Sequence, residues 1–142
     1  QGLPMRSLMD VGSGGGLPAV VIAVCFPELK VLSVDAVAKK TTFITQAALE
    51  LGLKNLRAKH SRVENIKEKF DVVTCRAFSS LKDFVSLTES NIGEPGMWLA
   101  MKGRRPDAEL QELPSFAEVT EVIDLHIPGL GEERSVVLMR HI

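Results

Sequence analysis

The chain of 142 residues has few cysteines and no long apolar run. Its two cysteines, Cys25 and Cys75, lie 50 residues apart with no CxxC pair. That pattern gives no sign of a zinc site and is typical of proteins in the reducing cytoplasm. The longest apolar run, residues 17–26, has ten residues and a proline. Because a membrane-spanning helix needs about 20 apolar residues, we expect no membrane insertion.

Neither sign of charge dominates, since 17 basic and 18 acidic residues give a net charge of −1. Domains that coat nucleic acid are usually basic overall, so any contact with nucleic acid is expected to be local. The three histidines have no ligand-like spacing, and we expect no metal. The first residues, QGLPMRSLMD, lack an initiator methionine and the features of a secretory signal. We expect a cytoplasmic protein, and a processed or truncated piece of a longer chain.

Strand-like and helix-like patterns alternate and predict a single α/β domain over residues 1–142. Strands are predicted at residues 6–11, 30–35, 55–60, 70–75, 96–103, 118–127 and 134–142. Helices are predicted at residues 17–26, 37–52, 80–90 and 105–114. Repeated β-α units indicate a mostly parallel sheet between helices. The last two strands flank PGLGEE and are expected to form an antiparallel hairpin.

Three of these helices carry specific expectations. Residues 17–26 read as a short buried helix. The helix over residues 37–52 is expected to end at Gly52 and to bury one face: Phe43, Ile44, Ala47, Ala48 and Leu51. The helix over residues 80–90 starts with a Ser80-x-x-Asp83 capping signature and is expected to bury Leu81, Phe84, Val85 and Thr88.

The stretch LMDVGSGGGLP, residues 8–18, places four glycines in five positions between the first strand and the first helix. Loops of this kind lie at the carboxyl edge of a parallel sheet, where ligands bind. Glycine also lets the backbone approach a ligand closely. A Walker A loop is disfavoured, because Pro18 and Ala19 stand where that motif has its lysine. A nucleoside cofactor without a triphosphate is the better interpretation.

Two cofactor classes fit this loop. Gly14-x-Gly16-x-x-Ala19 matches a dinucleotide fingerprint weakly. Asp10, Gly12, Gly14 and Gly16 also match D-x-G-x-G-x-G, which resembles the cofactor loop of class I S-adenosylmethionine-dependent methyltransferases. In that interpretation Asp10 offers a carboxylate to the cationic amino-acid part of the cofactor, or braces the loop amides.

Asp35 ends the second predicted strand and suits either cofactor class. Its carboxylate would accept hydrogen bonds from both ribose hydroxyls. The alternative is that it caps the helix that follows. The sequence leaves both roles open.

Six stretches resemble one family, in order and over nearly the whole chain: DVGSGGGLP, SVDAVAKKTTFI, SRVEN, CRAFSSLKDF, MKG and GEERSVV. They are similar to the RsmG or GidB type of bacterial 16S rRNA guanine-N7 methyltransferases. The resemblance implies a Rossmann-like class I methyltransferase fold and S-adenosyl-L-methionine as cofactor. It further implies 16S rRNA of the small ribosomal subunit as partner. Family members generally have an additional helical region before this domain, and we expect that region to be absent here.

The resemblance also assigns site residues. It implies that Gly12 and Leu17 contact the cofactor in the glycine loop and that Val63 and Glu64 flank its adenine end. It places Arg76 where cofactor and substrate meet, as a positioning residue. Nitrogen 7 of guanine has a free lone pair, so its methylation needs alignment rather than a general base.

Three further features of the sequence bear on this site. Arg76 could instead pair with Asp10 or Glu64. Cys75 is expected to be a core residue rather than the nucleophile of a cytosine methyltransferase. Lys102 and Arg104, in the densest basic patch, are predicted to contact RNA phosphates.

Two other functions remain open at this point. One is an NAD(P)-dependent oxidoreductase, although the chain has no tyrosine for a Tyr-Lys proton relay. The other is a non-catalytic nucleotide-binding or assembly module.

Overall fold

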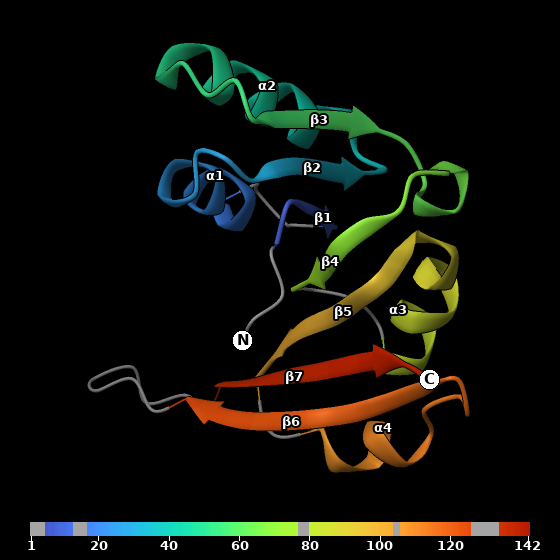
Figure 1. The fold of residues 1–142 in the computed structure, drawn as a ribbon. Coiled ribbons are helices and arrows are strands. Elements are labelled where there is room, and N and C mark those ends of the chain that lie inside the picture. Colours follow the sequence, from blue (N-terminus) through green and yellow to red (C-terminus); the bar gives the residue numbers. More distant parts are fainter. Residues whose placement is uncertain (1–4, 13–16, 77–79, 104–105, 126–133) are drawn as a thin grey trace.

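A computed structural model describes residues 5–12, 17–76, 80–103, 106–125 and 134–142 (Figure 1). Its seven-stranded sheet contains β1 (Ser7–Val11), β2 (Lys30–Asp35), β3 (Leu56–His60), β4 (Phe70–Cys75), β5 (Ile92–Lys102), β6 (Ala117–Leu125) and β7 (Arg134–His141). The helices are α1 (Leu17–Cys25), α2 (Ala38–Leu51), α3 (Leu81–Thr88) and α4 (Asp107–Gln111). Two 3-10 turns, η1 (Val63–Asn65) and η2 (Glu89–Asn91), complete the described elements.

The strands are ordered β3-β2-β1-β4-β5-β7-β6 across the sheet. Neighbouring strands from β3 to β5 are parallel, whereas β7 is antiparallel to both β5 and β6. This confirms the predicted mostly parallel sheet with a C-terminal antiparallel hairpin. The chain moves outward from β1 to β3 and then returns to the other side of β1 as β4. In open α/β sheets such a reversal opens a crevice at the carboxyl ends of the strands, where ligands bind.

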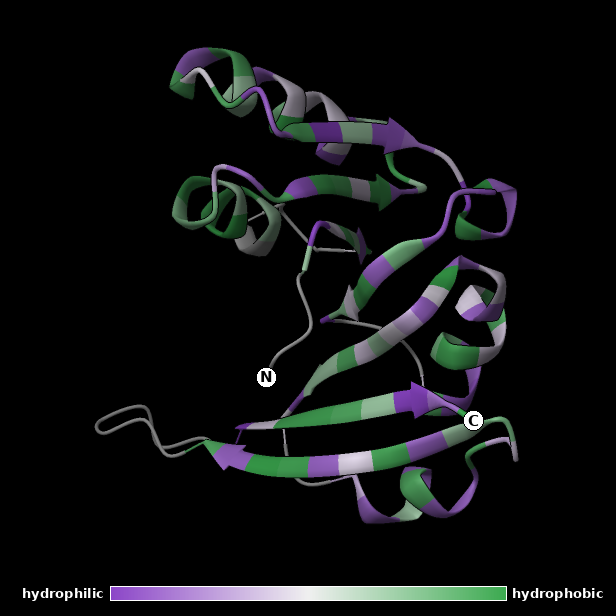
Figure 2. Cartoon of the chain, in the orientation of Figure 1, coloured by the Kyte–Doolittle hydropathy of each residue, from purple (hydrophilic) through white to green (hydrophobic). Residues whose placement is uncertain are grey.

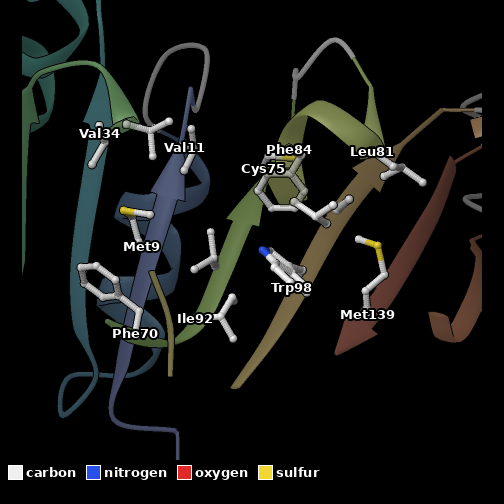
Figure 3. Close-up of a cluster of buried hydrophobic side chains, with 14 of the residues drawn as sticks. Met9, Val11, Val34, Phe70, Cys75, Leu81, Phe84, Ile92, Trp98 and Met139 are labelled. Carbon is white, nitrogen blue, oxygen red and sulfur yellow. The ribbon is translucent and has the colours of Figure 1, made fainter. Parts of the chain in front are cut away.

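Two buried clusters lie on opposite faces of the sheet. One joins α1 and α2 to the face of β1, β2 and β3. The other lies below α3 and is centred on Trp98, which is fully buried beside Phe84 (Figure 3). The indole Nε1 of Trp98 donates to Thr88 Oγ1 at 2.8 Å, so the polar atom of this large side chain is satisfied. The strands β1 and β2 are buried on both faces, as expected for the centre of a parallel sheet.

The predicted caps of α3 and α2 are confirmed. Ser80 Oγ accepts a hydrogen bond from the Asp83 backbone N–H at 3.1 Å, and α3 buries all four predicted side chains. Gly52 ends α2 in the left-handed conformation, with φ of 67°. Glycine favours that conformation because it has no Cβ.

The expected burial of α1 and α2 needs correction. The residues of α1 are mostly hydrophobic (Figure 2), yet Val21 and Val24 are about half exposed and only one side faces the sheet. In α2 the buried residues are Thr41 and Ile44, whereas Phe43, placed on the predicted face, is 52% exposed. Leu51, also on that predicted face, is 58% exposed. The Thr41 hydroxyl donates to the Ala38 carbonyl at 2.9 Å, so a threonine can occupy the buried face without an unsatisfied donor.

Candidate cofactor site

Three of the predicted site residues meet where the strand order reverses. Asp10 lies near the end of β1, Asp35 ends β2, and Arg76 follows β4 directly. These strands are neighbours, with β1 between β2 and β4. The parallel sheet therefore brings together residues that are far apart in the sequence, as the alternation of strands and helices predicted.

Asp10 is a buried carboxylate with one free oxygen. Its side chain is 1% exposed, and Oδ1 accepts a hydrogen bond from Thr74 Oγ1 at 2.9 Å. Among the described residues Oδ2 has no hydrogen-bond partner. Burial raises the pKa of Asp10 to about 6, against the lowering effects of the Thr74 hydrogen bond and the Arg76 charge. At neutral pH the group is mostly ionised, and a buried, unpartnered carboxylate oxygen fits a cationic ligand group.

Asp35 has the same arrangement of one held and one free oxygen. It is 6% exposed, and Oδ1 accepts from the Val37 backbone N–H at 2.9 Å, just before α2 begins. Within the described part of the chain, Oδ2 has no partner. The sequence left two roles open for this residue. Oδ1 holds the backbone just before α2, but the N-cap of α2 is Val37 and has no side-chain cap hydrogen bond. Binding of ligand hydroxyls by Oδ2 stays a prediction.

A cavity of about 280 Å³ opens beside Asp35. Its lining comes from the ends of β1 and β2, the segment after β3, and α3: Val11, Gly12, Val34, Asp35, Ala36, Ser61, Arg62, Val63, Glu64 and Leu87. Gly12 has φ of 60°, which favours glycine, and its N–H donates to the Val34 carbonyl at 2.9 Å. Four residues predicted to bind the cofactor, Gly12, Asp35, Val63 and Glu64, therefore line one cavity.

Other predicted residues cannot be placed in this cavity. Gly14 and Gly16 lie outside the described residues. Leu17 begins α1, but its side chain is not described. Ser61 and Arg62 are among the lining residues that were not predicted. Both follow the carboxyl end of β3, so the rule that ligands bind at that edge could have found them.

Leu87 had no such signal in the sequence. It is 39% exposed and belongs to α3, so it lines the cavity only because of how α3 lies across the sheet. Larger cavities of about 620 and 420 Å³ lie between α2 and β3. None of the predicted site residues lines either of them, so the smaller cavity is the candidate site.

Cys75 and Arg76 are neighbours at the carboxyl end of β4 but differ in exposure. Arg76 is exposed, and its charge lowers the pKa of Asp10. No ion pair joins Arg76 to Asp10 or to Glu64, all three of which the structure describes. Burial raises the pKa of the Cys75 thiol to about 12, which keeps it neutral. A neutral, buried thiol is not a nucleophile, so the prediction of a core cysteine is confirmed.

Lys102 holds α4 and the start of α3 to the sheet. Its Nζ lies 3.0 Å from Glu109 Oε1, and its side chain is only 14% exposed. The same Glu109 oxygen accepts from the Leu81 backbone N–H at 2.9 Å. Arg104 lies outside the described residues. RNA contact by Lys102 and Arg104 therefore stays a prediction.

Two features are absent from the described part of the chain. They contain no group of three or more histidine, cysteine, aspartate or glutamate side chains that could hold a metal ion. No helix among them is both long and apolar enough to cross a membrane.

The sequence matches one protein family over nearly its whole length. Residues 3–138 match the family described as rRNA small subunit methyltransferase G, GidB. Ribosomal RNA small subunit methyltransferase G of Paracidovorax citrulli (strain AAC00-1) is 58% identical over 133 residues, covering 94% of this chain and 55% of that protein. The protein of the same name from Verminephrobacter eiseniae (strain EF01-2) is 50% identical over 141 residues, covering 99% and 59%. The chain thus spans little more than half the length of these curated relatives.

Solved structures with a similar fold include proteins named as methyltransferases. TrmN from Thermus thermophilus superposes with a TM-score of 0.81 at 18% identity, over 98% of this chain and 45% of that chain. Coclaurine N-methyltransferase, bound to N-methylheliamine and SAH, gives 0.79 at 10% identity, over 97% and 68%. These likenesses confirm the predicted class I methyltransferase fold. Because the sequence match also covers nearly all of the chain, the chain belongs to the rRNA small subunit methyltransferase G family, GidB.

Proposed function

We propose that residues 1–142 form the methyltransferase domain of a protein that methylates nitrogen 7 of a guanine in 16S rRNA, with S-adenosyl-L-methionine as cofactor. The observation that carries this proposal is the pair of buried aspartates at the strand reversal. Asp10 and Asp35 each have one oxygen held by the protein and, among the described residues, one without a partner. The family match favours this activity over an NAD(P)-dependent oxidoreductase.

The chemistry of the two aspartates fits different parts of the proposed cofactor. The ionised Asp10 would bind the cationic amino group of the methionine part. Asp35 would accept hydrogen bonds from the ribose hydroxyls, while Val63 and Leu87 supply apolar surface for the adenine. When bound, the cofactor supplies a methyl group on a positively charged sulfur.

The described residues around the site suit a transfer that depends on alignment. The lone pair of guanine nitrogen 7 would form the new bond to the methyl carbon as the bond between that carbon and the cofactor sulfur breaks, releasing S-adenosylhomocysteine. No proton would have to be removed by the protein to form this bond. The Cys75 thiol is neutral and buried, and it takes no part. We propose that the exposed guanidinium of Arg76 orients the guanine, because bound alignment can supply much of a rate enhancement. Lys102 and Arg104 would contact RNA phosphates, and the cytoplasmic location stays a prediction.

Calorimetric titration of the chain with S-adenosylhomocysteine, run beside NADH, tests the proposed cofactor. We expect binding of S-adenosylhomocysteine alone. Binding of NADH alone would contradict the proposal. Transfer of a labelled methyl group to small ribosomal subunits that lack the modification then tests the substrate, first with this chain and then with a full-length relative. Transfer by the relative alone would support the non-catalytic interpretation of this chain.

A further inference from the structure

A row of polar side chains crosses the middle of the sheet beneath the site. Ser33 on β2, Asp10 on β1 and Thr74 on β4 are in register with one another. All three are buried, with exposures of 0%, 1% and 7%. Two residues earlier along each strand, the corresponding row is apolar: Val31, Leu8 and Val72. Buried polar groups are costly unless they are hydrogen-bonded, so this row requires an explanation.

Only one of the two hydroxyls beside Asp10 forms a hydrogen bond among the described residues. Thr74 Oγ1 donates to Asp10 Oδ1 at 2.9 Å, in a fully buried contact between side chains. Ser33 Oγ has no hydrogen-bond partner among the described residues. The Thr74 contact holds Oδ1 on the β4 side and leaves Oδ2 as the carboxylate oxygen without a partner among the described residues.

We propose that Thr74 is a positioning residue of the cofactor site, whose hydroxyl holds Asp10 Oδ1 so that Oδ2 presents its negative charge to the cationic amino group of the cofactor. This inference rests on the proposed function, because it takes the cofactor to meet Asp10. A carboxylate held in its binding orientation loses less freedom when the ligand arrives. A donor to the ionised form also favours that form over the neutral acid.

Burial and neighbouring charges act on the pKa of Asp10 together with the Thr74 hydrogen bond. Burial is the strongest influence and raises the pKa of Asp10, and the charge of Asp35 raises it further. The Thr74 hydrogen bond is the larger of the two opposing effects, and the charge of Arg76 is the smaller. The neighbouring Cys75 thiol is neutral and contributes no charge. Without Thr74, a larger fraction of the carboxyl would be protonated at pH values near the wild-type midpoint.

Titration of the ligand-free chain tests the first step. The ¹³C shift of the Asp10 carboxyl is followed by NMR against pH, and a wild-type midpoint near 6 is expected. In Thr74→Val the midpoint should rise by about one pH unit, because a hydrogen bond to a charged group is lost. Thr74→Ser keeps the hydroxyl and should restore the wild-type midpoint. Ser33→Ala removes the unused hydroxyl of the same row and should leave the midpoint unchanged.

Calorimetric titration with S-adenosylhomocysteine from about pH 5 to about pH 8 tests the second step. At pH 6 we expect Thr74→Val to bind roughly fivefold more weakly than wild type, since the ionised fractions would be about one tenth and one half. The deficit should shrink toward pH 8, and Thr74→Ser and Ser33→Ala should follow the wild-type curve. Thermal unfolding shows whether each variant is folded. If Thr74→Val does not fold, Thr74→Ala removes the same hydroxyl.

The outcomes separate the two proposals. If wild type binds S-adenosylhomocysteine and the hydroxyl-free variant has the wild-type pH profile, the role of Thr74 is overturned and the proposed function stands. If wild type binds no S-adenosylhomocysteine at any pH, the proposed function of this chain fails, and the role of Thr74 fails with it.

Discussion

The two halves of the sheet bury their residues differently. In the half made of β1 and β2, both faces are buried, and α1 and α2 cover one of them (Figure 1). In the half made of β5, β7 and β6, one face packs into the cluster around Trp98. On the other face, alternate side chains stay half-buried or exposed, among them Leu99, Leu138 and Ile123.

The difference shows where a polar residue is informative. Glu118 and Arg140 form an ion pair on the exposed face of β6 and β7, where charged side chains are ordinary. Asp10 and Asp35 lie in the covered half, where each carries a desolvation cost. A buried carboxylate with an unpartnered oxygen therefore points to a ligand, whereas an exposed charge does not. Four predictions test this contrast.

The largest effect on stability is expected at Trp98. Replacing this fully buried side chain by alanine in Trp98→Ala should lower the free energy of unfolding by about 3–5 kcal/mol, because a large cavity forms. Urea unfolding followed by far-UV circular dichroism measures the change, since the chain has no other tryptophan to report by fluorescence. Ile123→Ala, in the same half but on the exposed face, should cost less than about 1 kcal/mol. Equal losses in the two variants would contradict the difference between the faces.

Asp10→Asn should have the opposite effect on stability. The Asp10 carboxyl titrates near 3.8 when exposed and near 6 in the folded chain. Between these values folding takes up a proton, so the folded state loses stability as the pH rises, and the loss persists above pH 6. The uncharged asparagine avoids this loss and should raise the free energy of unfolding at neutral pH by about 1–3 kcal/mol.

The same variant should weaken binding of S-adenosylhomocysteine at least about tenfold, because the negative charge is gone. Urea unfolding at pH 7 and near pH 4 checks the first result, since the gain should shrink in acid. Calorimetry checks the second. A variant that is both less stable and able to bind normally would show that Asp10 is a structural residue.

Much of the fold could be predicted because the buried strands and caps have local signals. Strands β1, β2 and β4 are short and mostly apolar, and Ser80 and Gly52 are marked by residue type and position. The start of β5 was missed, since the glycines and proline in residues 93–96 indicate a turn. In the sheet these residues belong to the strand, and the pairing with β4 shifts register there. The start of β5 depends on its pairing with β4, and sequence patterns do not identify the partner strand.

Site residues could be predicted where a chemically distinctive residue type stands at the end of a predicted strand. Asp10 is the penultimate residue of one predicted strand and Asp35 ends the next, and a carboxylate at that place is unusual enough to be noticed. Thr74 was not singled out, because a threonine in a strand is ordinary by residue type. Its significance depends on the register that places it beside Asp10. Leu87 depends in the same way on how α3 lies against the sheet.

Asp35→Asn is expected to affect binding more moderately. The asparagine oxygen can still accept from the Val37 N–H, so the start of α2 should be preserved. Affinity for S-adenosylhomocysteine should fall about tenfold, because a neutral acceptor replaces a charged one. Asp71→Asn is the matched control, since the Asp71 carboxylate also accepts backbone N–H bonds, from Arg6 and Ser7, but at the start of β4. Equal losses by calorimetry would mean that the effect is not local to the site.

The smallest effect is expected in the exposed half, at the end of β7. His141 Nε2 lies 2.8 Å from Glu89 Oε2, and this hydrogen bond is the main reason that the pKa of His141 is raised. A raised histidine pKa stabilises the fold at pH values below 6.5, and this stabilisation is lost as the pH rises through the folded pKa. Thermal unfolding should therefore show a higher Tm for wild type than for Glu89→Gln in weak acid. In alkali the two Tm values should be equal. The difference should be small, because both side chains are over a third exposed, at 35% and 45%, and water screens the pair. Parallel curves for the two proteins would show that this exposed ion pair contributes nothing that depends on pH, unlike the buried carboxylate of Asp10.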